Sequence, residues 1–143
     1  MAGGDANNLR RPYPNGADSI AIIQSGPLVQ AAAAALTAYR WCELTVPFKC
    51  RVVHAERTAG LVTDADADGV LTVFDDSGTP KVVVPSQAIT ALAAGVATAK
   101  TLTIDPSLVL NAGALLRFEA TTGDAGDQIV GLVVTLWVVP ATV

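Results

Sequence analysis

Charged side chains are scarce in this chain of 143 residues. Asp, Glu, Lys and Arg together make up 15% of it, whereas about 25% is usual in soluble domains. The nine basic residues are scattered and the formal net charge is −4, so the chain lacks the basic stripe that binds nucleic-acid phosphates. A monomer with so little charge would expose apolar surface, which usually marks an interaction site. We therefore expect the protein to self-associate and not to bind nucleic acid.

Residue types that carry out chemistry are almost as scarce. The chain has one histidine, His54, and two cysteines, Cys42 and Cys50, without a C-x-x-C motif or a Cys/His cluster. This composition excludes a zinc site of the usual spacing. The cysteines flank a Val-Pro-Phe bend at residues 46–48. A disulfide across that bend and two reduced thiols in the core both stay open.

No motif indicates a catalytic centre. None of the five serines lies in a G-x-S-x-G nucleophile motif, and a Ser-His-Asp triad would have to use His54. We interpret His54 instead as a strand residue that its neighbours partly cover. A Gly-rich phosphate-binding loop is also absent from the sequence. The sequence thus predicts a protein that is not an enzyme, with no catalytic residue, no cofactor-binding residue and no cofactor.

An acidic stretch is the sharpest motif of the chain. Asp64, Asp66, Asp68 and Gly69 match the first half of a calcium-binding loop, and Asp75 stands at the twelfth position, where Glu is usual. Three converging carboxylates would repel one another without a cation. The alternative is a solvated acidic turn, which the strand-like flanks and the short side chain at position twelve favour. We expect the turn, and hence no metal site.

The sequence predicts no segment that enters a membrane. Residues 19–39 carry no charge and follow the pair Arg10 and Arg11, an arrangement superficially like a twin-arginine export signal. Polar residues and Pro27 interrupt the apolar run, however, and Asp18 stands where such a signal is uncharged. We therefore expect no signal peptide and no transmembrane helix.

Turn-forming residues divide the chain into short runs rich in Val, Leu, Ile and Thr. Residues 70–74 and 81–84, joined through Asp-Asp-Ser-Gly, predict a hairpin. About seven or eight such strands predict an all-β fold, either a β-sandwich or a jelly-roll-like barrel. The alanine-rich residues 30–39 fit a short helix or an extended lead-in. Residues 1–19, rich in Gly, Asn, Asp and Pro, predict a flexible N-terminal arm, and residues 20–143 a single β-sandwich domain.

The C-terminal residues 128–139 carry the strongest signal about assembly. Their sequence, QIVGLVVTLWVV, is apolar on both alternate sets of side chains, whereas a strand with one face in water alternates between apolar and polar residues. We expect one face to contact the chain's own core. The other face, which includes Trp137, is expected to contact another subunit.

A second aromatic feature lies earlier in the chain. Period-two alternation places Trp41 on the same side of its strand as Tyr39, Glu43 and Thr45. Such an aromatic pair on a polar side is either a ligand platform, for example for a sugar, or a contact with another subunit. We favour the contact.

Residues 37–139 resemble the decoration, or cement, proteins of tailed-bacteriophage heads. The high Ala, Val and Thr content, the few aromatic residues and the polar arm are similar, as is the apolar last strand. Three further stretches carry the resemblance: LTVPFKCRVVHAE, GVLTVFDDSGTPKV and TLTIDPSLVLNAGALLRFEATTGD.

The resemblance implies a structural protein of the virion. Proteins of that family are β-sandwiches or jelly rolls that trimerise on the outer capsid and hold neighbouring shell subunits together. It therefore implies a homotrimer that is made in the host cytoplasm, sits on the outer capsid surface and stabilises the shell by bridging copies of the major capsid protein. A phage tail, fibre or head–tail connector component stays open as an alternative, followed by a carbohydrate-binding β-sandwich module.

Overall fold

The computed structural model describes residues 20–59, 61–63, 70–89, 98–123 and 125–141. These residues form eleven β-strands and no helix, so the all-β prediction is confirmed. More strands are present than the sequence predicted because several are pieces of only two to four residues. Within the same residues, no helix could span a membrane. The arm predicted for residues 1–19 lies outside the described part of the chain.

The strands have the following bounds: β1 (Ala21–Gln24), β2 (Leu28–Val29), β3 (Tyr39–Thr45), β4 (Cys50–Ala59), β5 (Leu61–Thr63), β6 (Val70–Asp75), β7 (Lys81–Ala88), β8 (Thr98–Thr101), β9 (Val109–Leu110), β10 (Leu115–Thr121) and β11 (Gln128–Pro140).

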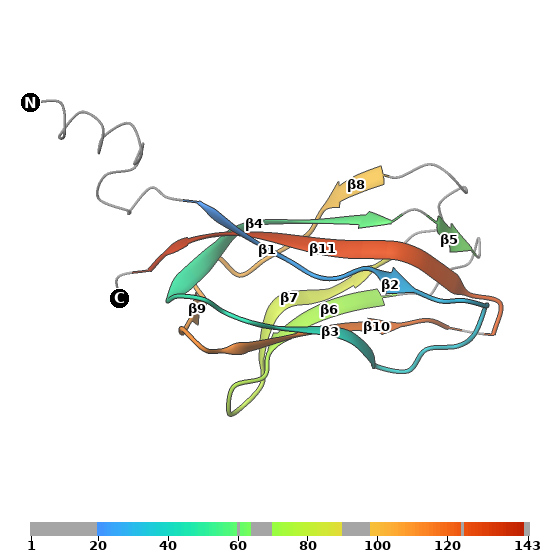
Figure 1. Cartoon of the computed structure of the whole chain (residues 1–143), viewed down its shortest axis with the longest axis horizontal. Coiled ribbons are helices and arrows are strands. Elements are labelled where there is room, and N and C mark those ends of the chain that lie inside the picture. Colours follow the sequence, from blue (N-terminus) through green and yellow to red (C-terminus); the bar gives the residue numbers. More distant parts are fainter. Residues whose placement is uncertain (1–19, 60, 64–69, 90–97, 124, 142–143) are drawn as a thin grey trace, which may run out of the picture.

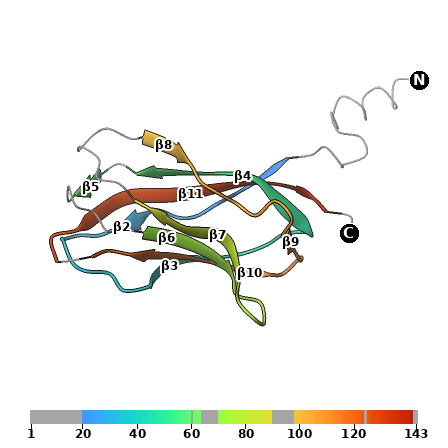
Figure 2. The ribbon, with the colours of Figure 1, turned by 180° about the vertical axis from the view of Figure 1, so that it is seen from behind.

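Two antiparallel sheets face each other as the layers of a sandwich (Figure 1). The first sheet has the order β1-β11-β4-β8, with β2 and β5 also paired to β11 and β9 paired to β4. The second sheet has the order β3-β10-β6-β7. The view from behind shows the same two layers, with the short strand β8 at the edge of the first sheet (Figure 2). Since neither sheet closes on itself, the sandwich is confirmed and the barrel is not observed.

The core lies between the sheets, and β11 contributes one whole face to it. Gly131 has a φ of 79° at a bulge in the pairing of β11 with β2, a conformation that glycine adopts without a steric penalty. The bulge moves the inward position from Val130 to its neighbour Ile129. Burying side chains of this kind stabilises a fold by roughly 1.5–3 kcal/mol each. The buried side chains of β11 are Ile129, Leu132, Val134, Leu136 and Val138.

The alanine-rich connection between β2 and β3 is extended, so the helix alternative is wrong. Its backbone is held in place by hydrogen bonds to residues that are far away in the sequence. The Gln30 N–H donates to the Ile129 carbonyl (2.9 Å), and the Ile129 N–H donates to the Gln30 side chain (2.7 Å). Further along, the Leu36 N–H donates to the Thr122 hydroxyl (2.7 Å). These buried tertiary bonds outweigh the intrinsic preference of alanine for a helix.

The predicted hairpin is formed by β6 and β7. The Asp75 carboxylate accepts the Ser77 N–H (3.0 Å), and Gly78 adopts a φ of 75° in the turn, as the turn chemistry predicted. Strand β7 runs further than predicted, to Ala88. Its Pro85 is tolerated because β7 lies at the edge of the second sheet, where one side of the strand needs no ladder bonds.

Candidate functional site

The most unusual surface is the outer face of the first sheet, which points away from the core. On β11 it carries Val133, Thr135, Trp137 and Val139, and all four side chains are partly exposed. The sequence predicted apolar cover on both faces of this strand. Within the described chain, only the inner face is covered. The outward face is therefore a second apolar surface over which none of the described strands forms a layer.

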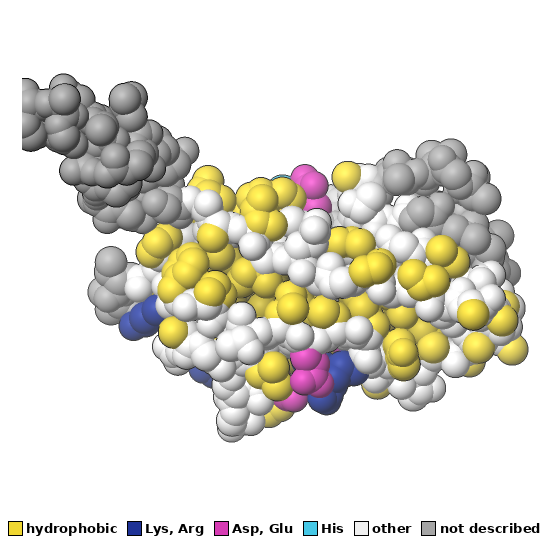
Figure 3. All heavy atoms as spheres, viewed as in Figure 1, with side chains coloured by type: hydrophobic (Ala, Val, Ile, Leu, Met, Phe, Trp, Pro, Cys, Tyr) yellow, Lys and Arg dark blue, Asp and Glu magenta, His cyan; other side chains and the backbone are white. Residues whose placement is uncertain are grey.

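Neighbouring strands extend this surface. Ile22 on β1 is paired with Trp137 and is 60% exposed, and Val53 on β4 is 46% exposed. We call Ile22, Val53, Trp137 and Val139 the apolar patch. The space-filling view shows apolar side chains gathered over β1, β2 and β11, with few charged side chains among them (Figure 3). Contiguous exposed apolar side chains of this kind mark interaction sites.

A bulge in β4 brings His54 into this surface. The register between β4 and β11 shifts between Trp137 and Val138, so Val53 and His54 are consecutive residues that both point outward. The imidazole lies beside the Trp137 ring, 4.9 Å between centroids, and its Nε2 lies 2.9 Å from a Glu56 carboxylate oxygen. As the sequence predicted, His54 lies on a strand and is partly covered. Its two contacts are both with neighbours on this face.

Three of the serines have structural partners. The Ser25 hydroxyl accepts the Val134 N–H (2.9 Å), and the Ser77 hydroxyl accepts the Leu115 N–H (2.9 Å). The Ser107 hydroxyl donates to the Asp105 carboxylate (2.6 Å). This last bond, with those from the Ser107 and Leu108 N–H groups, lowers the pKa of the exposed Asp105 carboxyl. Each of these hydroxyls therefore fixes a turn or a strand position.

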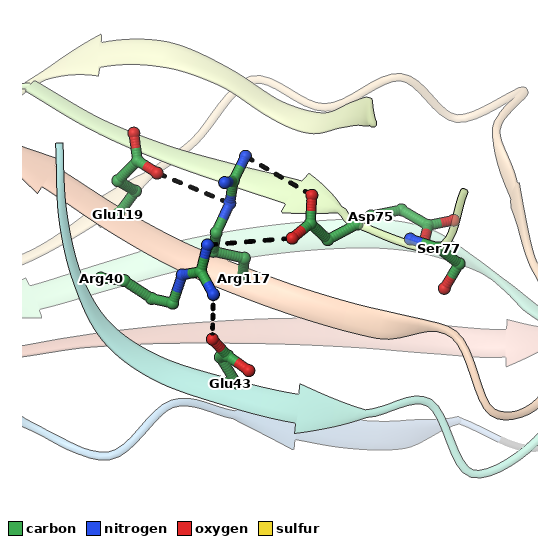
Figure 4. A network of polar contacts seen from close by, with 7 residues as sticks. Arg40, Glu43, Asp75, Ser77, Arg117 and Glu119 are labelled. Atoms are coloured by element: carbon green, nitrogen blue, oxygen red, sulfur yellow. Dashed lines mark hydrogen bonds and ion pairs between the residues drawn. The ribbon is translucent and has the colours of Figure 1, made fainter. Parts of the chain in front are cut away.

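The outer face of the second sheet carries a network of charges instead (Figure 4). The Asp76 carboxylate lies between two guanidinium groups, 3.7 Å from Arg117 and 3.9 Å from Arg40. Arg40 also pairs with Glu43, and Arg117 lies 3.5 Å from Glu119. The hydrogen bond to Glu43 raises the pKa of the exposed Arg40 guanidinium. The sequence placed Arg117 and Glu119 outward but did not predict the network.

The Arg117 guanidinium also lies over an aromatic ring of the same face, 4.5 Å from the centroid of the Phe74 ring. Arg117 and Phe74 are paired residues on β10 and β6. Their contact is a cation–π interaction, which is worth about 0.5–1 kcal/mol at sites open to solvent. The charged network and this contact give the second sheet a polar outer face that differs in character from that of the first sheet.

Trp41 does not take the position that simple alternation predicted. A register shift opposite Phe118 and Glu119 turns it toward the core, and its ring lies 5.9 Å from the Phe118 ring. The indole N–H donates to the Gly26 carbonyl (2.9 Å). The half-buried Trp41 therefore links β3 to the connection after β1 and packs against the core. Tyr39 remains 47% exposed and does not form an aromatic pair with it.

Both cysteines are free thiols, so the disulfide alternative is wrong. Cys50 belongs to the core, and burial raises the pKa of its thiol. The Cys42 sulfur is partly buried and accepts the Gly26 N–H (3.4 Å). These contacts match the alternative of small core residues.

Asp64, Asp66 and Asp68 of the acidic motif lie outside the described residues. Asp75, at the twelfth position of the motif, is buried, and its carboxylate serves the hairpin turn. Across the described ranges, no group of three or more His, Cys, Asp or Glu side chains is placed to hold a metal ion.

The buried arginine Arg57 was missed by sequence reasoning. Arg57 is only 1% exposed and lies on the inward face of β4, where burial lowers the pKa of its guanidinium. It takes part in interactions within the chain. The bulge at Val53 and His54 decides this placement because it exchanges the inward and outward positions that follow it.

Comparisons with known proteins give little beyond this geometry. No family model matches the chain, and no curated protein matches it. Among solved structures, 87% of the chain aligns with a chain of the structure of infectious bursal disease virus Gx strain, at 12% identity and a TM-score of 0.45. The alignment covers 33% of that viral chain, so this protein spans about a third of its length. A similarity at this level does not place the chain in a family.

Proposed function

We propose that this protein is a structural component of a bacteriophage particle that decorates the capsid and stabilises it by bridging shell subunits. The observation that carries the proposal is the apolar patch on the outer face of the first sheet. An apolar surface of this kind suits permanent burial in an assembly, whereas the charged network on the second sheet suits contact with water or a polar partner surface.

The bridging role follows from having unlike faces on one rigid sandwich. Copies joined through the apolar patch would each present their polar surfaces, and the predicted N-terminal arm, to the shell. Linked contacts of this kind raise avidity although each contact alone is weak. The resemblance of residues 37–139 to decoration proteins is the reason for proposing a bacteriophage particle. The same resemblance implies that the partner is the major capsid protein.

A binding experiment with empty shells tests this proposal. Shells assembled from the major capsid protein of the same phage are mixed with the purified protein and recovered by sedimentation, and negative-stain images locate the bound protein. We expect saturable binding over the whole outer surface and a higher temperature of shell disruption. Absence of binding would overturn the proposal. Binding confined to one vertex or to the tail would instead establish the connector or tail alternative.

The carbohydrate-binding alternative is not favoured by the structure. It depended on Trp41 and Tyr39 forming an exposed aromatic platform. Because the Trp41 ring packs toward Phe118 and its N–H donates to Gly26, that platform is not formed.

A further inference from the structure

Three rows of paired residues cross the outer face between β4 and β11. The central row is Trp137 with His54, the next is Val139 with Arg51, and the row on the opposite side is Thr135 with Glu56. On β11 these rows are evenly spaced, since they occupy alternate positions of one strand. The exposed Arg51 and the half-buried Glu56 therefore lie on the two sides of an uncharged centre, one row away in each direction.

The apolar part of this face lies in and beside the central row. Ile22 continues the row onto β1 because it is paired with Trp137. Val53, the bulged residue of β4, lies between the Arg51 row and the His54 row and is 46% exposed. The face thus has an apolar middle with a cation on one side and an anion on the other.

We propose that two copies of this chain pack through this face about a twofold axis that lies in the interface, perpendicular to the strands, along the row of Ile22, Trp137 and His54. This rotation reverses the strand direction and exchanges the two outer rows. Arg51 of one copy then lies opposite Glu56 of the partner subunit, and the same pair forms a second time by symmetry. The middle rows of the two copies cover each other.

Charge complementarity is what singles out a second copy as the occupant. A surface whose opposite charges are placed on opposite sides of an apolar centre is complementary to itself after a twofold rotation. Facing sheets pack about 10 Å apart, with their strands within about 30° of alignment. The long arginine side chain can reach across that distance to the carboxylate of the partner subunit. Glu56 can serve both His54 and an arginine because a carboxylate accepts several hydrogen bonds.

A twofold pair replaces the trimer that the resemblance implies. In a threefold ring, each interface joins two different patches of the molecule. The outer face of the second sheet, with its charged network, does not match the apolar patch. The twofold pairing rests on the self-association proposed above but not on shell binding. Measurements on the protein alone therefore separate the failure of one proposal from the failure of the other.

The first test is the molar mass of the purified chain in solution, measured by light scattering and sedimentation over a range of concentrations. We expect a species of twice the 14.6 kDa chain mass. Val53→Asp should yield monomers at concentrations where the natural chain is paired. Val82→Asp is the matched control, because Val82 on β7 of the other sheet is 45% exposed, and it should remain paired.

The second test reverses the two charges. Arg51→Glu and Glu56→Arg each place like charges opposite one another, and each should raise the dissociation constant of the pair by at least about tenfold. The double variant restores two complementary pairs and should recover most of the natural affinity. Glu56→Arg also removes the contact with His54, so Glu56→Gln serves as a reference for that loss.

The outcomes are decisive in both directions. Recovery of pairing in the double reversal supports the twofold arrangement, whether or not the Val53→Asp chain folds, as judged by circular dichroism. A double variant no better than the single variants would overturn it. A monomer only, a trimer, or equal effects of Val53→Asp and Val82→Asp would overturn it as well. Pairing without shell binding would leave this interface standing and refute only the capsid function.

Discussion

The Trp137 and His54 rings lie side by side on adjacent strands, with centroids 4.9 Å apart and planes tilted by 53°. Tilted contacts between aromatic rings add about 0.5–1.5 kcal/mol beyond the area that they bury. The contact orders both side chains at the centre of the outer face. It places the single histidine of the chain at the centre of the face that we propose as the contact between two copies.

The contacts of Trp41 should be important for stability. Trp41→Ala removes a half-buried ring and a hydrogen bond, and we expect it to lower the free energy of unfolding by about 2 kcal/mol. Trp41→Phe keeps the ring packing and should lose about 1 kcal/mol, the worth of the bond to Gly26. Tyr39→Ala, at an exposed neighbour, is the control, with little change expected. Urea denaturation measures all three, and an Ala variant as stable as the control would show that Trp41 is a surface residue.

Substitutions at three glycines can distinguish the cost of backbone strain from the cost of steric crowding. An added methyl group at Gly26, Gly78 or Gly113 would meet nothing within 4 Å, but only Gly78 and Gly113 have positive φ angles, 75° and 83°. Gly78→Ala and Gly113→Ala should each cost about 1 kcal/mol in the free energy of unfolding because the left-handed conformation disfavours a Cβ. Gly26→Ala should cost nothing measurable. Equal effects at all three positions in thermal or urea unfolding would contradict this account.

The buried Cys50 thiol should make stability depend on alkaline pH. Burial raises its pKa in the folded state, so its contribution is fully present below the unfolded pKa of about 8.5 and is lost as the pH rises through the folded pKa. Unfolding free energies measured between pH 7 and 10 should therefore fall more steeply for the natural chain than for Cys50→Ala. Under native conditions, a thiol reagent should modify Cys42 before Cys50. Parallel pH profiles for the two chains would argue against this role of the thiol.

Calcium should have no marked effect on folding. We expect chelation to leave the melting temperature nearly unchanged, because the solvated turn that the sequence predicts for Asp64, Asp66 and Asp68 would have no preference for the ion in the folded state. A tight site would add about 3 kcal/mol at a hundredfold excess over its dissociation constant. A clear rise in melting temperature with calcium, abolished in Asp66→Asn, would establish a calcium site instead.

The predicted N-terminal arm should contribute to capsid binding. Arg10, Arg11 and Tyr13 offer salt bridges and an aromatic anchor, and ordering a flexible segment reduces the affinity that it adds. Deleting residues 2–18 should leave the oligomer folded but lower its occupancy on shells and make those shells easier to disrupt by heat. Shells saturated equally by the truncated and the full chain would show that the arm has no part in binding.

Features set by local chemistry were predictable from the sequence. The hairpin of β6 and β7 follows from Asp and Gly at turn positions, and the outward Arg117 and Glu119 follow from alternation along β10. The apolar second face of β11 was also visible, because it needs only the sequence of one strand. Its neighbours Ile22 and Val53 joined the patch only when strand pairing was known.

Features set by bulges and tertiary bonds were not predictable. Trp41 turns inward because β3 shifts register against β10. No residue type at that position predicts the shift from the sequence. The extended connection after β2 depends on Gln30 and Thr122, whose partners lie 99 and 86 residues away along the chain. Sequence periodicity carries no information about such distant partners, so the helix and the strand were equally good interpretations.

The β4 bulge has a consequence for how this protein tolerates changes in length. Val53 and His54 both point outward, so the alternation of inward and outward side chains shifts by one residue at this point. As a result, Arg57 lies in the core while Glu56 faces out. Val53 is the extra residue of this bulge, so deleting it would restore regular alternation, with His54 and Glu56 still outward and Arg57 still inward. Strand β4 can therefore lose one residue at position 53 without exchanging its two faces, and what such a deletion removes is the exposed Val53 side chain of the apolar patch.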